Sequence, residues 1–151
     1  LSSISDDPSS YLAIRGHIYQ DLGQLLDARQ DFADMRALRE QHGDIGGVGE
    51  ALSDLGLIEL ALGNSREAQA LLRRGTEMLE AAGRHPFAIR AQKRIAYAQL
   101  RAYHPFLALK ELCSAYEKAQ EHQVYGQITP LMESMHELSC RLGVWSRRNF
   151  D

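Results

Sequence analysis

The residue types best suited to metal or acid–base chemistry gather near the C-terminus. Glu133 and His136 form one Glu-x-x-His pair, and Glu137 follows the histidine directly. A di-iron bundle needs two such pairs and further glutamates, and this sequence has no second pair. A zinc-protease helix reads His-Glu-x-x-His, but Cys140 occupies the position of its second histidine. We therefore expect no metal site and no cofactor.

One glycine-rich stretch has the composition of a phosphate-binding loop. Residues 43–49 contain four glycines. Such a loop follows a strand, and a Walker site ends in Gly-Lys-Ser/Thr, but neither feature is present here. Gly83 follows Gly43 at the same interval that separates Gly23 from Gly63. We therefore interpret the stretch as a turn between repeated units.

The cysteines and histidines show no arrangement typical of catalysis. Cys113 and Cys140 stand far apart in the sequence, at a spacing that matches no metal motif. We interpret Cys113 as a small buried residue of a protein in a reducing compartment. Four histidines near predicted turns, at positions 42, 85, 104 and 122, are expected to be solvated. No nucleophile can be paired with a base, so we expect no enzyme.

A period of about 40 residues, within the range of known helical repeats, organises the chain. Four sets of similar residues recur at this spacing: Gly16, Gly56, Ala96 and His136; Gly23, Gly63, Tyr103 and Gly143; Ala28, Ala68 and Ala108; Phe32, Leu72 and Leu112. Such repetition is typical of a solenoid, in which each unit buries its apolar face against the next.

The second copy shows what one unit is. Apolar residues at 51, 52, 55, 58 and 62 have the spacing of an amphipathic helix. Gly63 and Asn64 end it, and Ser65 is expected to cap a second helix. Small residues at Gly56 and Ala68 would let the two helices approach closely. The repeated unit is therefore predicted to be a helical hairpin.

These residues resemble the tetratricopeptide repeat. The second copy supplies Leu52, Leu55, Gly56, Gly63, Ala68 and Leu72, and the first supplies Leu12, Gly16, Tyr19, Gly23, Ala28 and Phe32. Glu59 departs from the family tyrosine, and Arg15 departs from the family leucine. The resemblance implies an all-α, right-handed superhelical solenoid. We expect one domain over 1–151, with repeats at about 9–43, 49–83 and 88–122 and a partial repeat at 128–151.

The resemblance also implies that the first helix of each hairpin lines a concave groove. Its expected lining is His17, Gln20 and Asp21; Glu50, Ser53, Leu57 and Leu60; Arg90, Lys93, Tyr97, Leu100 and Arg101; Glu133, Glu137 and Arg141. Positions 90, 93, 97, 100 and 101 share one helix face. Their cations and tyrosine suit an acidic or carboxylate-ended peptide. The alternative is a solvated charged face, balanced by Glu50 and Glu133.

Residues 143–151 allow two interpretations. Gly143, Arg147, Arg148, Phe150 and Asp151 look like the opening of a diguanylate cyclase domain, at whose sensory end such repeat arrays occur. The alternative is a fourth hairpin, with Gly143 as its turn and a new helix beginning near Arg147.

The chain end also bears on assembly. A last helix at 129–142 would present an unpaired apolar face through Met132, Met135 and Leu138. We expect residues 144–151, anchored by Trp145 and Phe150, to cover it, or a homodimer to form through the C-terminal helices.

Composition and charge narrow the function. The net charge is −3, with 44% hydrophobic and 25% charged residues, which suits an ordinary soluble domain and gives no general attraction to nucleic acid or membranes. Because the sequence starts at Leu1, we expect a fragment of a larger, cytoplasmic protein. The favoured function is non-catalytic protein or peptide binding. The alternatives are a regulatory domain of a diguanylate cyclase or transcription activator, and an oligomerisation module.

Overall fold

The computed structural model describes the backbone of residues 7–150 and the side chains of residues 7–143. Within that part of the chain there are seven α-helices and no strand, which confirms the predicted all-α fold. The helices are α1 (Pro8–Asp21), α2 (Leu25–Gln41), α3 (Ile45–Ala61), α4 (Ser65–Ala81), α5 (His85–Arg101), α6 (Pro105–Glu121) and α7 (Tyr125–Phe150).

The turns between these helices share one geometry. Each has three residues, and its middle residue takes a positive φ: Gly23, Gly43, Gly63, Gly83, Tyr103 and Gln123. In the first turn the Gly23 amide donates to the Gln20 carbonyl at 3.0 Å, and the Gln24 amide donates to the Tyr19 carbonyl at 2.8 Å. This is the Schellman pattern, which satisfies the last carbonyls of a helix. The structural period is therefore a helix plus a turn, half of the sequence period.

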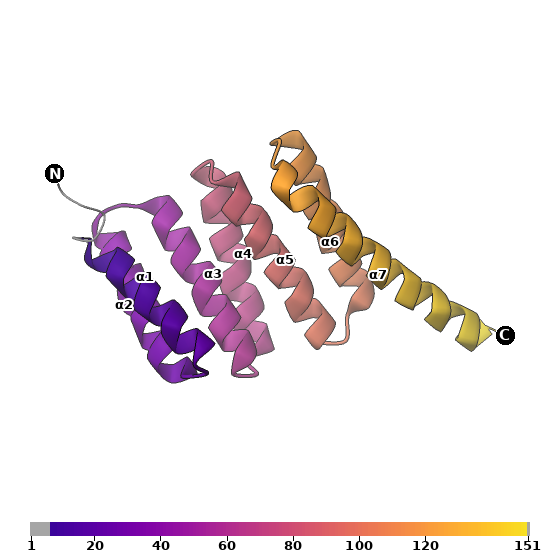
Figure 1. Ribbon diagram of the computed structural model, residues 1–151, viewed down its shortest axis with the longest axis horizontal. Helices are drawn as coiled ribbons and strands as arrows, with labels where there is room; N and C mark the ends of the chain where they lie inside the picture. The colour runs from indigo at the N-terminus through magenta and orange to yellow at the C-terminus, as the bar shows by residue number, and fades with distance from the viewer. Residues whose placement is uncertain (1–6, 151) are drawn as a thin grey trace. The chain divides into compact units, whose positions relative to one another are not determined.

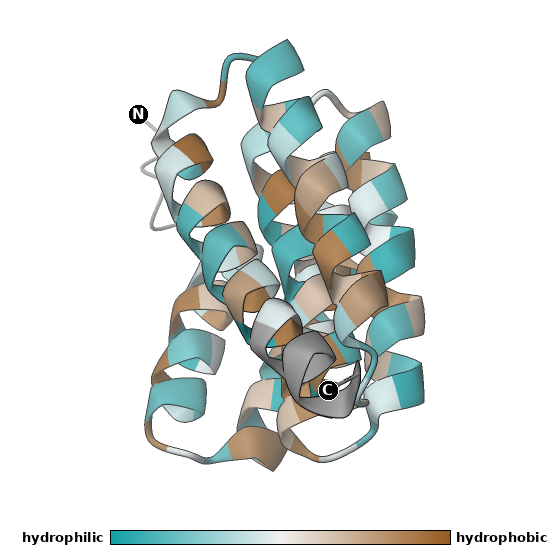
Figure 2. Ribbon diagram, turned by 90° about the vertical axis from the view of Figure 1, so that its right-hand side faces the viewer, coloured by the Kyte–Doolittle hydropathy of each residue, from teal (hydrophilic) through white to brown (hydrophobic). Residues whose placement is uncertain are grey.

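The chain divides into two compact units, Leu1–Arg84 and His85–Asp151. In the first unit α1 packs on α2, α2 on α3, and α3 on α4; in the second α5 packs on α6, and α6 on α7 (Figure 1). Hydrophobic and hydrophilic residues alternate along the helices, as expected where one helix face is buried (Figure 2).

Small residues set the distance between paired helices in the first unit. A β-carbon on Gly16 would lie 2.6 Å from Cε1 of Phe32, and one on Gly56 would lie 2.6 Å from Cγ of Leu72. Both contacts join residues from the repeated sets found in the sequence. Ala68 is fully buried in the same hairpin as Gly56. The hairpins are therefore close-packed where the sequence period places small residues.

The glycine-rich stretch serves two purposes. Gly43 lies in a turn, as predicted, with φ of 66°. The other glycines belong to α3 and are buried: Gly46, Gly47 and Gly49. A β-carbon on Gly46 would collide with the side chain of Arg84, which reaches Glu50 at 3.0 Å. The turn interpretation was thus wrong for these three glycines, because they make room for packed side chains.

The two residues that depart from the repeat pattern, Arg15 and Glu59, each form an ion pair. Arg15 binds the buried Asp31 through two hydrogen bonds of 2.8 and 2.7 Å. Arg29 binds the buried Glu59 through two hydrogen bonds of 2.7 and 3.0 Å, and Asn64 adds a third at 2.7 Å. The Arg29 guanidinium, assisted by Asn64, holds the pKa of Glu59 below its ordinary value. Each buried carboxylate is thus hydrogen-bonded by an arginine from a neighbouring helix.

The end of the chain differs from prediction. The helix expected at 129–142, the turn at Gly143 and a new helix near Arg147 are replaced by the unbroken α7. Gly143 does not take the positive φ of the other turns. Glycine permits a left-handed turn but does not impose one. Pro130 lies within α7, where its missing N–H costs one backbone hydrogen bond.

The face of α7 that was expected to be unpaired is largely covered. Leu138 is buried and Met135 half-buried, both packed in a cluster with α6 residues. Met132 alone of the three remains exposed. The side chains of Trp145 and Phe150, expected to cover this face, lie outside the described residues.

Two predictions about small polar side chains were wrong. Ser65 is the first residue of α4, and the capping position belongs to Asn64, whose side chain bonds Glu59 instead of the helix end. Cys113 is only half-buried, and Cys140 is exposed; both are free thiols.

We expect Ala68→Leu to lower the stability of the first unit by about 1–3 kcal/mol, because the hairpin has no room for a larger side chain. Thermal denaturation followed by circular dichroism measures this. Ala70→Leu is the matched control, since Ala70 is exposed on the same helix. Equal melting temperatures for the two variants would contradict the packing described above.

The Arg15–Asp31 pair should be replaceable by leucines. One period later the same positions hold Leu55 and Leu71. Arg15→Leu alone should lower the melting temperature, because it leaves the Asp31 carboxylate buried without its cation. The double change to leucine should restore at least most of the loss. A double variant as unstable as the single one would show that the two repeats are not equivalent here.

Candidate functional site

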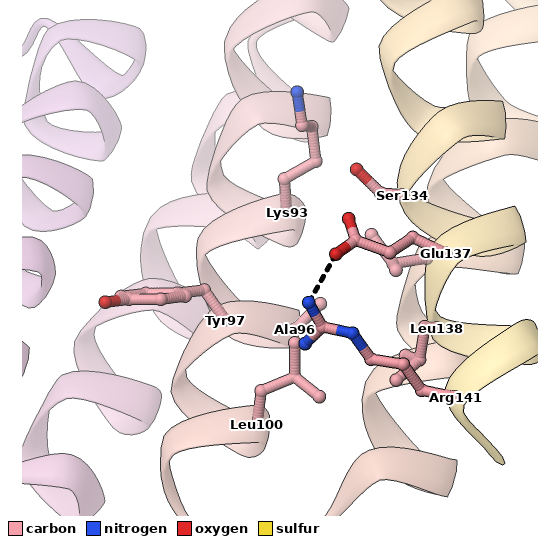
Figure 3. A pocket seen from close by; sticks show the side chains of 9 residues that line it. Lys93, Ala96, Tyr97, Leu100, Ser134, Glu137, Leu138 and Arg141 are labelled. Atoms are coloured by element: carbon pink, nitrogen blue, oxygen red, sulfur yellow. Dashed lines mark hydrogen bonds and ion pairs between the residues drawn. The ribbon is translucent and has the colours of Figure 1, made fainter. Parts of the chain in front are cut away.

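A pocket of about 220 Å³ opens between α5 and α7 in the second unit (Figure 3). Its lining comprises Lys93, Ala96, Tyr97 and Leu100 from α5, Leu112 from α6, and Ser134, Glu137, Leu138 and Arg141 from α7. Ala96, Leu112 and Leu138 are almost completely buried and form an apolar floor. The polar side chains therefore surround a hydrophobic base.

Helix periodicity explains why these residues meet. The α5 residues stand at 93, 96, 97 and 100, and the α7 residues at 134, 137, 138 and 141. Spacings of three and four place each group on one face of its helix. Both α5 and α7 contact α6, which contributes Leu112 between them. The pocket is therefore bounded by two facing helix stripes.

The charges around the pocket are mainly positive. Arg141 pairs with Glu137 one turn earlier on α7, and both side chains are exposed (Figure 3). Lys93 has no carboxylate partner among the residues that the structure describes. Arg101 lies beside the pocket, where its Nη1 donates to the Tyr97 hydroxyl at 3.3 Å. Two cations thus remain available beside one internal ion pair.

Part of the predicted groove lines this pocket. Lys93, Tyr97, Leu100, Glu137 and Arg141 all do so. In Figure 3 the Tyr97 ring points away from α7, so it forms a border of the pocket and does not close it.

Other predicted groove residues of the second unit lie outside the lining. The guanidinium carbon of Arg90 lies over the Phe87 ring, 5.3 Å from its centroid. Glu133 is exposed on α7. Arg101 reaches the pocket only through its contact with Tyr97.

The predicted groove residues of the first unit have other surroundings. Ser53 and Leu60 are buried, so neither side chain presents an open surface, and Leu57 is half-buried. Glu50 accepts hydrogen bonds from Arg39 and Arg84. These two arginines, from the same unit as Glu50, engage its carboxylate.

The groove residues predicted on α1 are partly engaged as well. The His17 Nε2 atom lies 3.6 Å from the Asp54 Oδ2 atom, and the His17 ring packs edge-on against the Phe32 ring. Gln20 contacts His17 at 3.3 Å, and Asp21 is exposed.

A second hollow of about 580 Å³ adjoins the pocket and was missed in the sequence. The two share Leu100, Leu138 and Arg141, and the second adds Tyr103, Pro105, Phe106 and Leu142. Tyr103 is 91% exposed and has φ of 62° in a turn where the first two copies have glycine. A bulky residue in that conformation is strained and often marks a functional position. This substitution is the signal in the sequence that could have located the hollow.

The described side chains contain no cluster of three or more His, Cys, Asp or Glu that would hold a metal ion. The Cys140 Sγ atom lies 3.6 Å from the His136 Nε2 atom on the exposed side of α7. The rings of His85 and His122 are stacked, with their centroids 3.5 Å apart. Among the described residues, no helix combines the length and apolar character needed to cross a membrane.

Comparison with known proteins adds no assignment. No protein-family model matches this sequence, and a search of curated proteins finds no significant match.

We expect Tyr103→Gly to stabilise the second unit by about 1 kcal/mol, because glycine removes the strain of a left-handed residue. Gln123→Gly is the matched control, since Gln123 has φ of 58° in the next turn but lines neither hollow. Both variants should raise the melting temperature. Only the first should change ligand binding at the hollow, and an unchanged or lower melting temperature for both would contradict the strain.

Proposed function

We propose that this chain is a non-catalytic, cytoplasmic repeat module, built of tetratricopeptide-like hairpins in a right-handed superhelix, that binds a segment of a partner protein. The observation that carries this proposal is the pocket between α5 and α7, with its apolar floor and surplus of cations. The two free cysteines support a reducing compartment.

The division of the site into two adjoining hollows suits a peptide, which could place a side chain or chain end in each. Small-molecule sites usually measure about 300–1,000 Å³, so a pocket of about 220 Å³ suits one side chain or one chain end. The adjoining hollow, bordered by Tyr103 and Phe106, would take the next apolar side chain. Lys93 and Arg101 would bind a carboxylate, because charge-assisted hydrogen bonds to such groups are strong. The preferred ligand is therefore an acidic or carboxylate-ended segment with a hydrophobic residue.

The polar groups of the pocket support binding over catalysis. The Ser134 hydroxyl donates to the Pro130 carbonyl of its own helix at 2.9 Å, so it is not paired with a base. No histidine lines the pocket. A hydrolytic site would need a nucleophile held by a base, together with donors for an oxyanion.

Fluorescence polarisation with labelled hexapeptides ending in Leu or Phe tests the proposal. Peptides with a free C-terminal carboxylate should bind about 10-fold or more tightly than their C-terminal amides. The double variant Lys93→Glu/Arg101→Glu should remove that preference and leave the melting temperature nearly unchanged. Lys110→Glu is the matched control, because Lys110 is exposed on α6 and lines neither hollow.

Equal affinity for acid and amide, or binding that survives the double reversal, would show that the charged stripe is merely solvated. Loss of binding together with a lower melting temperature would mean that these cations hold the helices in place.

A regulatory domain of a diguanylate cyclase or transcription activator is the second candidate. It is favoured by α7, which runs without a break through Gly143 to Phe150 where a fourth hairpin would have turned. The complete gene tests it: a cyclase or other effector domain in the same reading frame would support this candidate, and a gene without one would overturn it.

A further inference from the structure

The pocket between α5 and α7 contains a carboxylate of its own. Among the described residues that line it, Glu137 alone is acidic. Figure 3 shows the side chains of Glu137 and Arg141 both pointing from α7 toward α5, with an ion pair joining them. A negative charge at this place opposes the carboxylate ligand of the proposed function. The free pocket thus already holds one contact between a carboxylate and a guanidinium.

Hairpin packing does not explain this acidic residue. The side chains of Glu137 and Arg141 are 64 and 74% exposed. The equivalent position of the earlier copies holds His17, Leu57 and Tyr97, so the repeat does not require a charge there. An exposed ion pair one helical turn apart changes an equilibrium constant by only about twofold. A ligand carboxylate with better geometry can therefore displace Glu137 from Arg141.

Arg141 stands where the two hollows meet. It lines both of them, together with Leu100 and Leu138. A planar guanidinium binds a carboxylate through two parallel hydrogen bonds. The α-carboxylate of a C-terminal apolar residue can reach Arg141 while the side chain of the same residue enters the adjoining hollow, beside Tyr103 and Phe106. An internal Asp or Glu uses its side chain for the carboxylate and leaves that hollow empty.

We propose that Glu137 is an internal competitor for Arg141, and that the C-terminal carboxylate of a partner ending in a large apolar residue binds by displacing it. This inference rests on the proposed function, because it concerns the same pocket and names the partner end that fits it. Lys93 and Arg101 attract the carboxylate, and Arg141, once released, becomes the third cation. Glu137 thus weakens the binding of a free chain end, leaves an uncharged end unaffected, and makes release of the partner easier.

Fluorescence polarisation tests the competitor, with an N-terminally labelled hexapeptide ending in Phe, prepared as the free acid and as the C-terminal amide. Glu137→Gln should strengthen binding of the acid by about fivefold, because it frees Arg141 and removes the repulsion between two carboxylates. The affinity for the amide should not change. Arg141→Gln should weaken binding of the acid by about 10-fold. Glu133→Gln is the matched control, because it removes the same charge from an exposed position of α7 outside both hollows, and it should change neither affinity.

NMR of the arginine Nε–H groups observes the exchange directly. The signal of Arg141 is identified by its absence from the spectrum of Arg141→Gln. Saturation with the acid should shift this signal in the wild-type chain, and saturation with the amide should leave it in place. An Arg141 signal that the acid does not move would overturn the proposal.

The wild-type chain and the variants decide different questions. Equal affinity of the wild-type chain for acid and amide refutes the proposed function, and the competitor with it. A wild-type chain that prefers the acid, with Glu137→Gln no stronger, keeps the proposed function and overturns the competitor. An equal gain in Glu133→Gln also overturns it, because loss of any nearby negative charge would then suffice. Weaker binding by Glu137→Gln with a lower melting temperature would overturn it in favour of a pair that only supports the helix.

Discussion

A left-handed residue at every twentieth position determines most of this structure. It lets the chain reverse in three residues while the last carbonyls of each helix remain hydrogen-bonded. Because these residues recur every 20 positions, α2 through α6 all have 17 residues, and equivalent residues return to the same register position in successive hairpins. The close contacts of Gly16 with Phe32 and Gly56 with Leu72 follow from this register. Tyr103 and Gln123 take the same conformation without being glycine, in turns that keep the same backbone hydrogen bonds.

The sequence predicted features that recur, and it missed features that occur once. Gly56 and Leu72 could be paired because their counterparts stand one period away. Two features of the set Gly23, Gly63, Tyr103 and Gly143 could not be predicted. Tyr103 forms the turn without being glycine, and Gly143 continues a helix where the others form a turn. In the pocket, Lys93, Tyr97 and Glu137 were expected from the register that the tetratricopeptide resemblance implies, and Lys93 and Tyr97 also share one predicted helix face. Leu112 did not, because its contribution depends on how α6 lies between α5 and α7.

Ion pairs replace apolar contacts at particular repeats. Arg15 with Asp31 occupies the register of Leu55 with Leu71, and Arg29 with Glu59 stands where the repeat pattern has a tyrosine. A buried pair stabilises little beyond what a well-packed apolar pair would, but a mismatched neighbour leaves a buried charge unpaired. We therefore expect such pairs to penalise incorrect stacking among otherwise similar hairpins. This need is acute in a repeat protein, where each hairpin resembles the correct partner of every other.

The same periodicity explains why the candidate site differs between the units. Tyr97 and Glu137 are one period apart, as are Arg101 and Arg141, so α5 and α7 present one register to the pocket. The corresponding residues of the first unit are His17 with Leu57, and Asp21 with Ala61. These carry no surplus of cations, and His17 is engaged by Asp54 and Phe32. The backbone register thus recurs along the chain, and the cations Lys93, Arg101 and Arg141 distinguish the second unit, because the first unit has Ser53, Asp21 and Ala61 at equivalent positions. Under the proposed function, selectivity for an anionic segment would depend on a few substitutions within this fixed frame, and Arg101→Ala should therefore weaken the binding of a carboxylate-ended peptide.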